Sequence, residues 1–179
     1  DNTDALCRSQ IQAGYSYLYP PIMLGAHVSP VPNHQVGRKT SLHTRGLTAM
    51  SGNLGYELDL TSLPDNEKNE IIEQINFYKA HRSLFQFGKF YRLQAPNEFF
   101  ASAWLFVNDT EAAVIYFNGL ARPAVPVKNL KTHYLDDQAI YVFIDTGQRV
   151  SGAELNYAGI AIPRIKEDFS TLLFHWKKV

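Results

Sequence analysis

The spacing of apolar residues changes near the middle of the 179-residue chain. Before about Phe87, segments with helical spacing alternate with short apolar runs, which is typical of α/β construction. After Gly88, apolar and polar residues alternate with a period of two, in short runs rich in aromatic and β-branched residues. The pattern therefore predicts two regions, 1–88 and 89–179, with the boundary between Phe87 and Tyr91.

The first region is predicted to hold helices and strands in alternation. Asn2 or Thr3 is the expected N-cap of its first helix, and Gly14 the stop. In its last and clearest helix, Ile71 and Ile75 lie on a stripe that faces the core. The order of elements is the one expected for the last quarter of a (β/α)8 barrel, which cannot close by itself. The predicted elements are a helix over 2–13, a strand over 22–28 that is apolar on both faces, a helix over 40–52, a strand over 55–61 and a helix over 63–82.

The second region is predicted to be all β. Turn signals such as Asn118-Gly119 and Ser151-Gly152 separate its apolar runs. Many short strands at this spacing suggest an antiparallel sandwich or barrel. The predicted strands are 90–93, 101–107, 113–117, 139–144, 158–162 and 171–176.

Composition and charge narrow the classes of function. Apolar residues make up 45% of the chain, which is ample for a buried core. The 17 basic residues balance the 17 acidic ones, and without a basic stripe we expect no nucleic-acid partner. The sequence contains no apolar run of 18 or more residues, so we expect no membrane span. Cys7 is the single cysteine, which favours a reducing compartment and so predicts a cytoplasmic protein.

Histidines and short motifs give little support to metal or nucleotide chemistry. His27, His34 and His43 lie in one strand–loop–helix region, but their spacings match no zinc pattern. The chain also carries no glycine-rich nucleotide loop and no serine-hydrolase elbow. The sequence therefore predicts no metal site and no cofactor.

Carboxylate pairs are the remaining candidates for chemistry. Asp1 and Asp4 stand three residues apart at the start of the first helix, where free N–H groups and the helix dipole stabilise negative charge. From the residues alone, capping is the simpler interpretation of both. Glu57 and Asp59 share one face of a predicted strand, and we expect them to be solvated.

The loop over 29–39 has dense hydrogen-bonding capacity. It follows the predicted strand over 22–28 directly, and active sites of (β/α)8 barrels are built from loops at strand carboxyl ends. Surface loops are polar for ordinary reasons as well, so composition leaves both interpretations open. Its candidate side chains are Asn33, His34, Gln35 and Arg38.

A series of segments in unbroken order over residues 1–93 resembles the α-galactosidases of glycoside hydrolase family 36. Asp1-Asn2-Thr3-Asp4-Ala5 resembles the segment at the end of barrel strand six in that family. In the β half the resemblance is looser, with Leu120-Ala121-Arg122-Pro123 and Gly152-Ala153-Glu154-Leu155 as its recognisable points. The other matching segments are Tyr19-Pro20-Pro21, residues 23–38 (MLGAHVSPVPNHQVGR), Thr40-Ser41-Leu42, Thr44-Arg45-Gly46, residues 55–60 (GYELDL), Gln74, Phe77-Tyr78-Lys79 and Phe90-Tyr91-Arg92-Leu93.

The resemblance implies a retaining glycosidase that removes terminal α-linked galactose from melibiose- and raffinose-type galactosides. Such enzymes use two carboxyls about 5–5.5 Å apart, one as nucleophile and one as acid/base. Matched residue by residue, Asp1 is the acid/base, and Asp4 keeps a place at the helix start. Asn2 or Thr3, and not Asp1, should then accept the helix N–H groups, so that the acid/base can hold its proton.

The family's remaining parts are implied partners of this chain. They are the first six barrel strands with the nucleophile, an N-terminal β domain and further copies in a homo-oligomer. The resemblance assigns no substrate-binding residue here. We expect these 179 residues alone to be inactive toward galactosides. The β region is implied to be a C-terminal antiparallel sandwich.

An alternative function is a non-catalytic carbohydrate-binding or assembly β domain that carries a remnant of a barrel. Exposed, coplanar aromatic rings on one sheet face would favour sugar binding, and buried rings would favour a packing role. Most of these rings stand at alternating strand positions, where core packing is the ordinary outcome. The aromatic residues in question are Tyr91, Trp104, Tyr116, Phe117, Tyr134, Tyr141, Tyr157 and Trp176.

Overall fold

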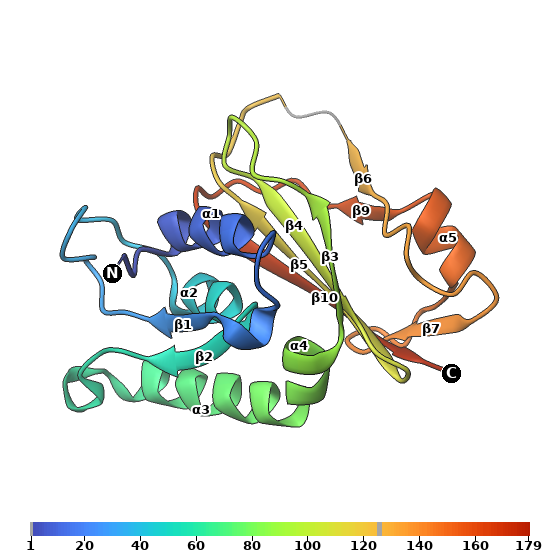
Figure 1. Cartoon of the computed structure of the whole chain (residues 1–179). Coiled ribbons are helices and arrows are strands. Elements are labelled where there is room, and N and C mark those ends of the chain that lie inside the picture. The colour runs from blue at the N-terminus through green and yellow to red at the C-terminus, as the bar shows by residue number, and fades with distance from the viewer. Residues whose placement is uncertain (1, 125–126) are drawn as a thin grey trace.

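The computed structural model describes residues 2–124 and 127–179 (Figure 1). Among these residues, no helix has the length and apolar character needed to cross a membrane. The helices are α1 (Ala5–Tyr15), α2 (Leu42–Met50), α3 (Asp65–Ala80), α4 (Arg82–Phe87) and α5 (Gly152–Tyr157), with 3-10 turns at Pro21–Met23 and Leu60–Ser62. The strands are β1 (Gly25–Val28), β2 (Asn53–Tyr56), β3 (Lys89–Gln94), β4 (Ser102–Val107), β5 (Glu111–Asn118), β6 (Lys128–Leu130), β7 (Ile140–Phe143), β8 (Arg149–Ser151), β9 (Ile160–Ile162) and β10 (Ser170–Lys178).

The strands form one large antiparallel sheet and two small ones. The large sheet has the order β3-β4-β5-β10-β7-β8, and all of its pairings are antiparallel. β1 and β2 form a parallel pair in the first region, and β6 pairs with β9. Helices α1 to α4 lie on one side of the large sheet, and β6, β9 and α5 lie toward the other (Figure 1). The predicted change from α/β construction to an antiparallel sheet is confirmed.

The start of α1 differs from the prediction in its capping residue. Asp4 is the N-cap, and its Oδ2 accepts a hydrogen bond of 3.0 Å from the Cys7 N–H. Asn2 instead accepts from the Asp4 N–H through its Oδ1 at 2.9 Å. The expected caps, Asn2 and Thr3, are therefore wrong. The charged Asp4 side chain serves the positive helix end, where a carboxylate is the more favourable acceptor.

Strand β1 is shorter and more one-sided than predicted. The 3-10 turn at Pro21–Met23 takes the first residues of the expected run, so that the strand begins at Gly25. Ala26 and Val28 are fully buried, whereas Gly25 and His27 are exposed. The prediction of a strand buried on both faces is wrong for this chain, because in the described residues only β2 pairs with β1 and one face packs on a helix.

All six strands predicted for the second region are present, but two short strands and a helix were not expected. β6 and β8 have three residues each, too few to show a period of two. Helix α5 begins where a Ser151-Gly152 turn was predicted. Ser151 is its N-cap and accepts a hydrogen bond of 3.0 Å from the Glu154 N–H through Oγ. The turn prediction is wrong because serine followed by glutamate three residues later also starts helices.

Both faces of the large sheet are buried, by different parts of the chain. On one face Trp104, Phe106 and Ile115 pack against the helices, and the Phe106 ring lies edge-on to Phe85 of α4 with centroids 5.2 Å apart. On the other face, alternate residues of the same strands pack against the loops and short elements of residues 130–160. That second set comprises Ala103, Leu105, Ala112, Val114, Tyr116, Tyr141 and Trp176, with Leu130, Leu135, Leu155 and Ile160 opposite.

Three titratable side chains meet where the end of α3 lies beside the large sheet. His81 caps the end of α3, Glu111 opens β5 and His175 lies in β10. Glu111 Oε2 lies 2.7 Å from His81 Nδ1 and 2.9 Å from His175 Nε2. Burial lowers the pKa of His175, although the hydrogen bond to Glu111 opposes this shift. Burial of the His175 ring thus disfavours its charged form.

Truncating a ring between helices and sheet should cost much more than truncating a surface ring of the same type. We expect Phe106→Ala to lower the free energy of unfolding by about 3–5 kcal/mol, because Phe106 is fully buried and its loss leaves a cavity. Phe87 is 70% exposed, and Phe87→Ala should stay within about 0.5 kcal/mol. Urea denaturation of the two variants checks this. Equal losses would show that the helices do not depend on the sheet for their stability.

Candidate active-site rim

The segment that leads into α1 is anchored along its whole described length. Asp1 lies outside the described residues, and Thr3 and Asp4 are buried. The backbone carbonyl of Thr3 accepts from Ser29 Oγ at 3.1 Å, and Thr3 Oγ1 accepts from Asn33 Nδ2 at 3.3 Å. Residues 29 and 33 belong to the loop after β1, so this loop fixes the backbone that immediately follows Asp1.

The segment that leads into α1 (residues 2–4) and the loop over 29–38 together form the candidate rim. Asp4 is the most buried charged residue of this rim. Its side chain is 2% exposed, and its Oδ2 takes hydrogen bonds from both the Cys7 N–H and Arg38 Nη1. The Arg38 guanidinium also lies over the ring of Phe169, 4.8 Å from its centroid. Phe169 stands just before β10, so one contact chain runs from the large sheet through Arg38 to the start of α1. Because Asp4 is buried and takes one hydrogen bond from the backbone and one from a charged side chain, its position at the start of α1 is fixed from both sides.

The loop after β1 is itself braced internally and by α2. Asn33 Oδ1 accepts from the backbone N–H groups of Gln35 and Val36 at 3.0 and 3.2 Å. Arg45 of α2 donates from Nη1 to the carbonyl of Ser29 at 2.6 Å. Burial lowers the pKa of Arg45, while nearby glutamates oppose the shift. The loop is thus a fixed support and not a loose surface segment.

The loop candidates predicted from sequence divide into two groups. Asn33 and Arg38 hold the rim together through the contacts just described. His34 and Gln35 are exposed at the surface of the loop. His27 and His43 are exposed as well, and with His34 they form no group of three potential metal ligands among the described residues.

Glu57 and Asp59 are exposed, as predicted. Glu57 lies 3.6 Å from His27 Nδ1, and both side chains are open to solvent. Asp59 accepts from the Thr61 N–H at 2.9 Å and starts the 3-10 turn that follows β2. Its hydrogen bonds with Thr61 lower the pKa of Asp59. The contacts found for these two carboxylates are therefore local ones, with His27 and Thr61.

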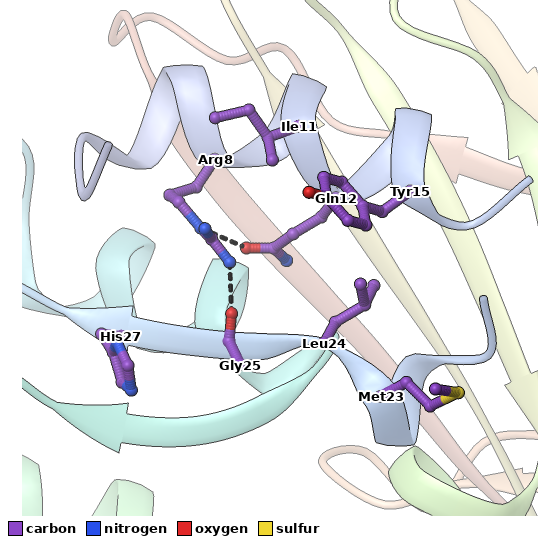
Figure 2. A pocket seen from close by; sticks show the side chains of 8 residues that line it. All are labelled: Arg8, Ile11, Gln12, Tyr15, Met23, Leu24, Gly25 and His27. Carbon is purple, nitrogen blue, oxygen red and sulfur yellow. Dashed lines mark hydrogen bonds between the residues drawn. The ribbon is translucent and has the colours of Figure 1, made fainter. Parts of the chain in front are cut away.

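A cleft of about 460 Å³ lies between α1 and β1 (Figure 2). The Arg8 guanidinium crosses it, donating from Nε to Gln12 Oε1 at 3.1 Å and from Nη2 to the carbonyl of Gly25. Gln12 donates onward to the carbonyl of Thr48 at 2.8 Å. The eight residues that line the cleft include no carboxylate, so the cleft lacks the carboxyl pair that glycoside hydrolysis ordinarily uses. The cleft follows the edge of β1 that β2 does not occupy.

Two family models match the chain. The model described as Melibiase matches residues 1–88, and the model described as Glycosyl hydrolase family 36 C-terminal domain matches residues 101–176. Among curated proteins, the alpha-galactosidase AgaA of Geobacillus stearothermophilus is 49% identical over 181 residues. The bifunctional alpha-galactosidase/sucrose kinase AgaSK of Mediterraneibacter gnavus is 42% identical over 176 residues. The chain is covered to 100% and 97%, respectively, but spans only 25% and 19% of the length of these relatives.

Solved structures give the same result. A Geobacillus stearothermophilus AgaA variant in complex with raffinose superposes with a TM-score of 0.95 at 48% identity. The galactosidase domain of AgaSK superposes with a TM-score of 0.94 at 40% identity. In both cases the match covers all of this chain and 25% of the other chain.

The Arg38–Asp4 pair should matter more than an exposed ion pair. We expect Arg38→Met to lower the free energy of unfolding by about 2–3 kcal/mol, because it leaves the Asp4 carboxylate buried without its charged partner. The value lies below that for a fully buried pair because Arg38 is 24% exposed. Lys68→Met is the matched control: it breaks the exposed Lys68–Asp65 pair and should cost no more than about 0.5 kcal/mol. Chemical denaturation measures both, and an Arg38→Met loss no larger than the control would contradict the positioning role of Asp4.

Proposed function

Because the chain belongs to glycoside hydrolase family 36, we propose that it is the C-terminal part of a retaining α-galactosidase. The proposed activity is removal of terminal α-linked galactose from melibiose- and raffinose-type galactosides. The observation that carries the proposal is the match of the whole chain to α-galactosidases at up to 49% identity and a TM-score of 0.95. Family 36 enzymes act by two carboxyls, so the chemistry requires one on each side of the scissile bond.

We propose that residues 1–88 are the last segments of a (β/α)8 barrel and that residues 89–179 are a C-terminal antiparallel sandwich domain. The parallel pairing of β1 with β2 and the helices packed beside them support the first part. The cleft along the free edge of β1 is the place where a preceding parallel strand would pair. The remaining barrel strands and an N-terminal β domain are then the structural partners of this chain. The short β6–β9 pair, with α5, is the proposed second layer against the large sheet.

Asp1 is the proposed acid/base. In the first step it would protonate the glycosidic oxygen as the nucleophile attacks, and in the second it would take a proton from the attacking water. The nucleophile is proposed to lie on an earlier barrel strand, outside this chain. The capping role of Asp4 supports the assignment, because the N–H of Cys7 in the first turn of α1 is bound by Asp4 and is not left to stabilise an ionised Asp1.

The rim gives the second region a part in the proposed reaction. Phe169 supports Arg38, Arg38 binds Asp4, and Asp4 fixes the first turn of α1 three residues after Asp1. Small displacements of a catalytic group are costly, since the reacting atoms must meet within a narrow range of distance and angle. The sandwich is thus proposed to hold the acid/base in place without touching the substrate.

The alternative, a carbohydrate-binding β domain, has less support. Tyr134 and Tyr157 are exposed, but Tyr134 stacks on Tyr91 with centroids 4.0 Å apart and so has one face covered. A sugar-binding face requires exposed rings lying side by side, and packing rings are buried. The buried members of the aromatic set are Trp104, Tyr116, Phe117, Tyr141 and Trp176.

The cellular location and the oligomeric state of the proposed enzyme are proposed on separate grounds. Cys7 is free and is the single cysteine, which supports a cytoplasmic location. A homo-oligomer is proposed from the family resemblance, with the α-galactoside as the small-molecule partner.

Replacing Asp1 should affect the two steps of the reaction differently. In the intact protein, Asp1→Asn should lower kcat/KM for raffinose by about 10²–10⁴, the usual contribution of a general acid. An aryl galactoside with a strongly acidic phenol should be affected less in its first step, because its leaving group needs no proton. Added azide should then accelerate turnover and yield α-galactosyl azide, because azide attacks without a general base. The measurement is steady-state kinetics with product analysis.

Asp4→Asn is the matched control for this experiment. It removes a carboxylate three residues away but keeps an oxygen that can accept from the Cys7 N–H. This variant should show no acceleration by azide and no selective tolerance of acidic leaving groups. Azide acceleration in Asp4→Asn, with none in Asp1→Asn, would move the acid/base from Asp1 to Asp4.

The isolated 179-residue chain should release no nitrophenol from the aryl α-galactoside, since one carboxyl of the pair lies outside it. The intact protein under the same conditions is the positive control. Turnover by the isolated chain that exceeds the uncatalysed rate and is lost in Asp1→Asn would show that the nucleophile lies within these residues.

A further inference from the structure

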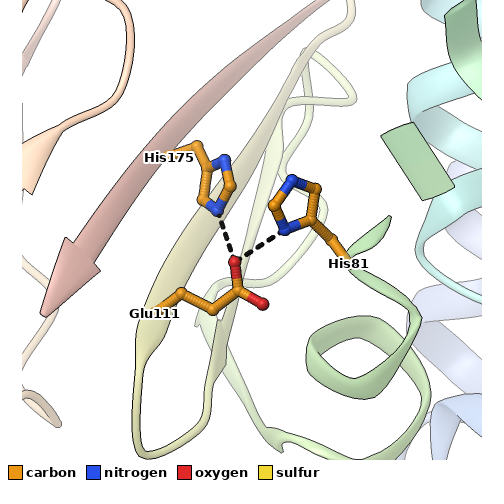
Figure 3. A group of neighbouring side chains, drawn as sticks. All are labelled: His81, Glu111 and His175. Atoms are coloured by element: carbon orange, nitrogen blue, oxygen red, sulfur yellow. Dashed lines mark hydrogen bonds and ion pairs between the residues drawn. The ribbon is translucent and has the colours of Figure 1, made fainter. Parts of the chain in front are cut away.

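The cluster of His81, Glu111 and His175 lies apart from the rim and has no part in the proposed reaction (Figure 3). Its three ligand atoms, one from each residue, all lie within 4.8 Å of one another. Figure 3 shows both imidazole rings directed at the same oxygen of the Glu111 carboxylate. Two imidazole rings thus share one oxygen of a single carboxylate, which an ordinary surface ion pair does not show.

Each member comes from a different element and is held there by packing. His81 lies against Phe77 with ring centroids 4.6 Å apart, and His175 meets His81 edge-on at 4.5 Å. Glu111 is the first residue of β5, whose following residues are buried in the sheet. Because the helix end and both strands are fixed by the shared core, the three side chains are brought together before any ligand arrives. Preorganisation of this kind favours binding.

The donor set is one that suits a borderline divalent ion. Two imidazole nitrogens and one carboxylate oxygen are common ligands of Zn²⁺, which takes four ligands and often leaves one position for water. The carboxylate is the one group of the three that can bring negative charge to the cation. The His175 side chain is 5% exposed, whereas Glu111 and His81 are 14% and 26% exposed, so the site opens to solvent on one side. A water molecule can therefore complete the coordination from that side.

We propose that His81 Nδ1, His175 Nε2 and the Glu111 carboxylate form a Zn²⁺ site that clamps the end of α3 to strands β5 and β10. To admit the ion, the two N···O separations of 2.7 and 2.9 Å must widen by roughly half an ångström, toward the spacing of tetrahedral ligands. Rotation of the partly exposed His81 and Glu111 side chains can supply this movement. The proposal departs from the sequence-based expectation of no metal site, which considered other histidines.

The test is zinc binding by the intact protein after treatment with chelator and dialysis. Titration calorimetry with ZnCl₂ is run on the wild type and on Glu111→Gln, His175→Gln and His43→Gln. We expect the wild type to contain a site that is weakened at least about 10-fold in the two cluster variants. His43→Gln removes an exposed imidazole of α2 and should bind zinc as the wild type does. X-ray absorption of the zinc-loaded wild type should show two imidazole ligands, and one in His175→Gln.

Folding is controlled by circular dichroism of each zinc-free variant. Should His175→Gln unfold because the ring is buried, His81→Gln takes its place, since His81 is more exposed. The readout is then the loss of the same site and of one imidazole ligand. The proposal is overturned when the wild type binds no zinc, or when zinc affinity and stoichiometry are the same in the cluster variants as in the wild type.

Discussion

Burial of the large sheet on both faces is the constraint on which the rest of the structure depends. A strand has two sets of side chains that point in opposite directions, so a sheet with two apolar faces needs a cover on each. Here β5 is buried from Ala112 to Phe117 without interruption. Its odd-numbered residues face helices of the first region, and the even-numbered ones face the second region. The two parts of the chain are consequently joined through a shared core and not through a linker.

That shared core explains why residues far apart in the sequence come into contact with a defined geometry. Phe169 reaches Arg38, and His175 reaches His81, only because β10 runs along the helical layer. One contact supports the rim beside the proposed acid/base, and the other forms the proposed zinc clamp. Both contacts connect the β region to the first region, one from a residue just before β10 and the other from a residue within it.

Sequence patterns predicted the elements whose residues alternate or recur over many positions. The long runs of β4 and β5 and the stripe of Ile71 and Ile75 on α3 carried enough residues to show their period. Three-residue strands such as β6 carry no period, and their pairing depends on the partner strand brought beside them. The stripe predicted for α3 did not include Gln74, whose side chain is polar and nevertheless buried. It is buried because it bonds the Leu42 carbonyl and Tyr56, which only the tertiary structure supplies.

The candidate chemistry shows the same division between local and distant signals. Asp4 as a helix-start residue follows from three neighbouring positions, and it is a local feature that sequence could predict. The ligand cluster could not be predicted by spacing, since 30 residues separate its first two members and 64 its last two. Zinc motifs are recognised when ligands share a turn or helix, where chain geometry alone sets their distance. When each ligand comes from a different element, that distance is set by the core that packs the elements together. A site of this kind can therefore be recognised only in the folded chain. Its ligands are held in place because the sheet that carries two of them is rigid.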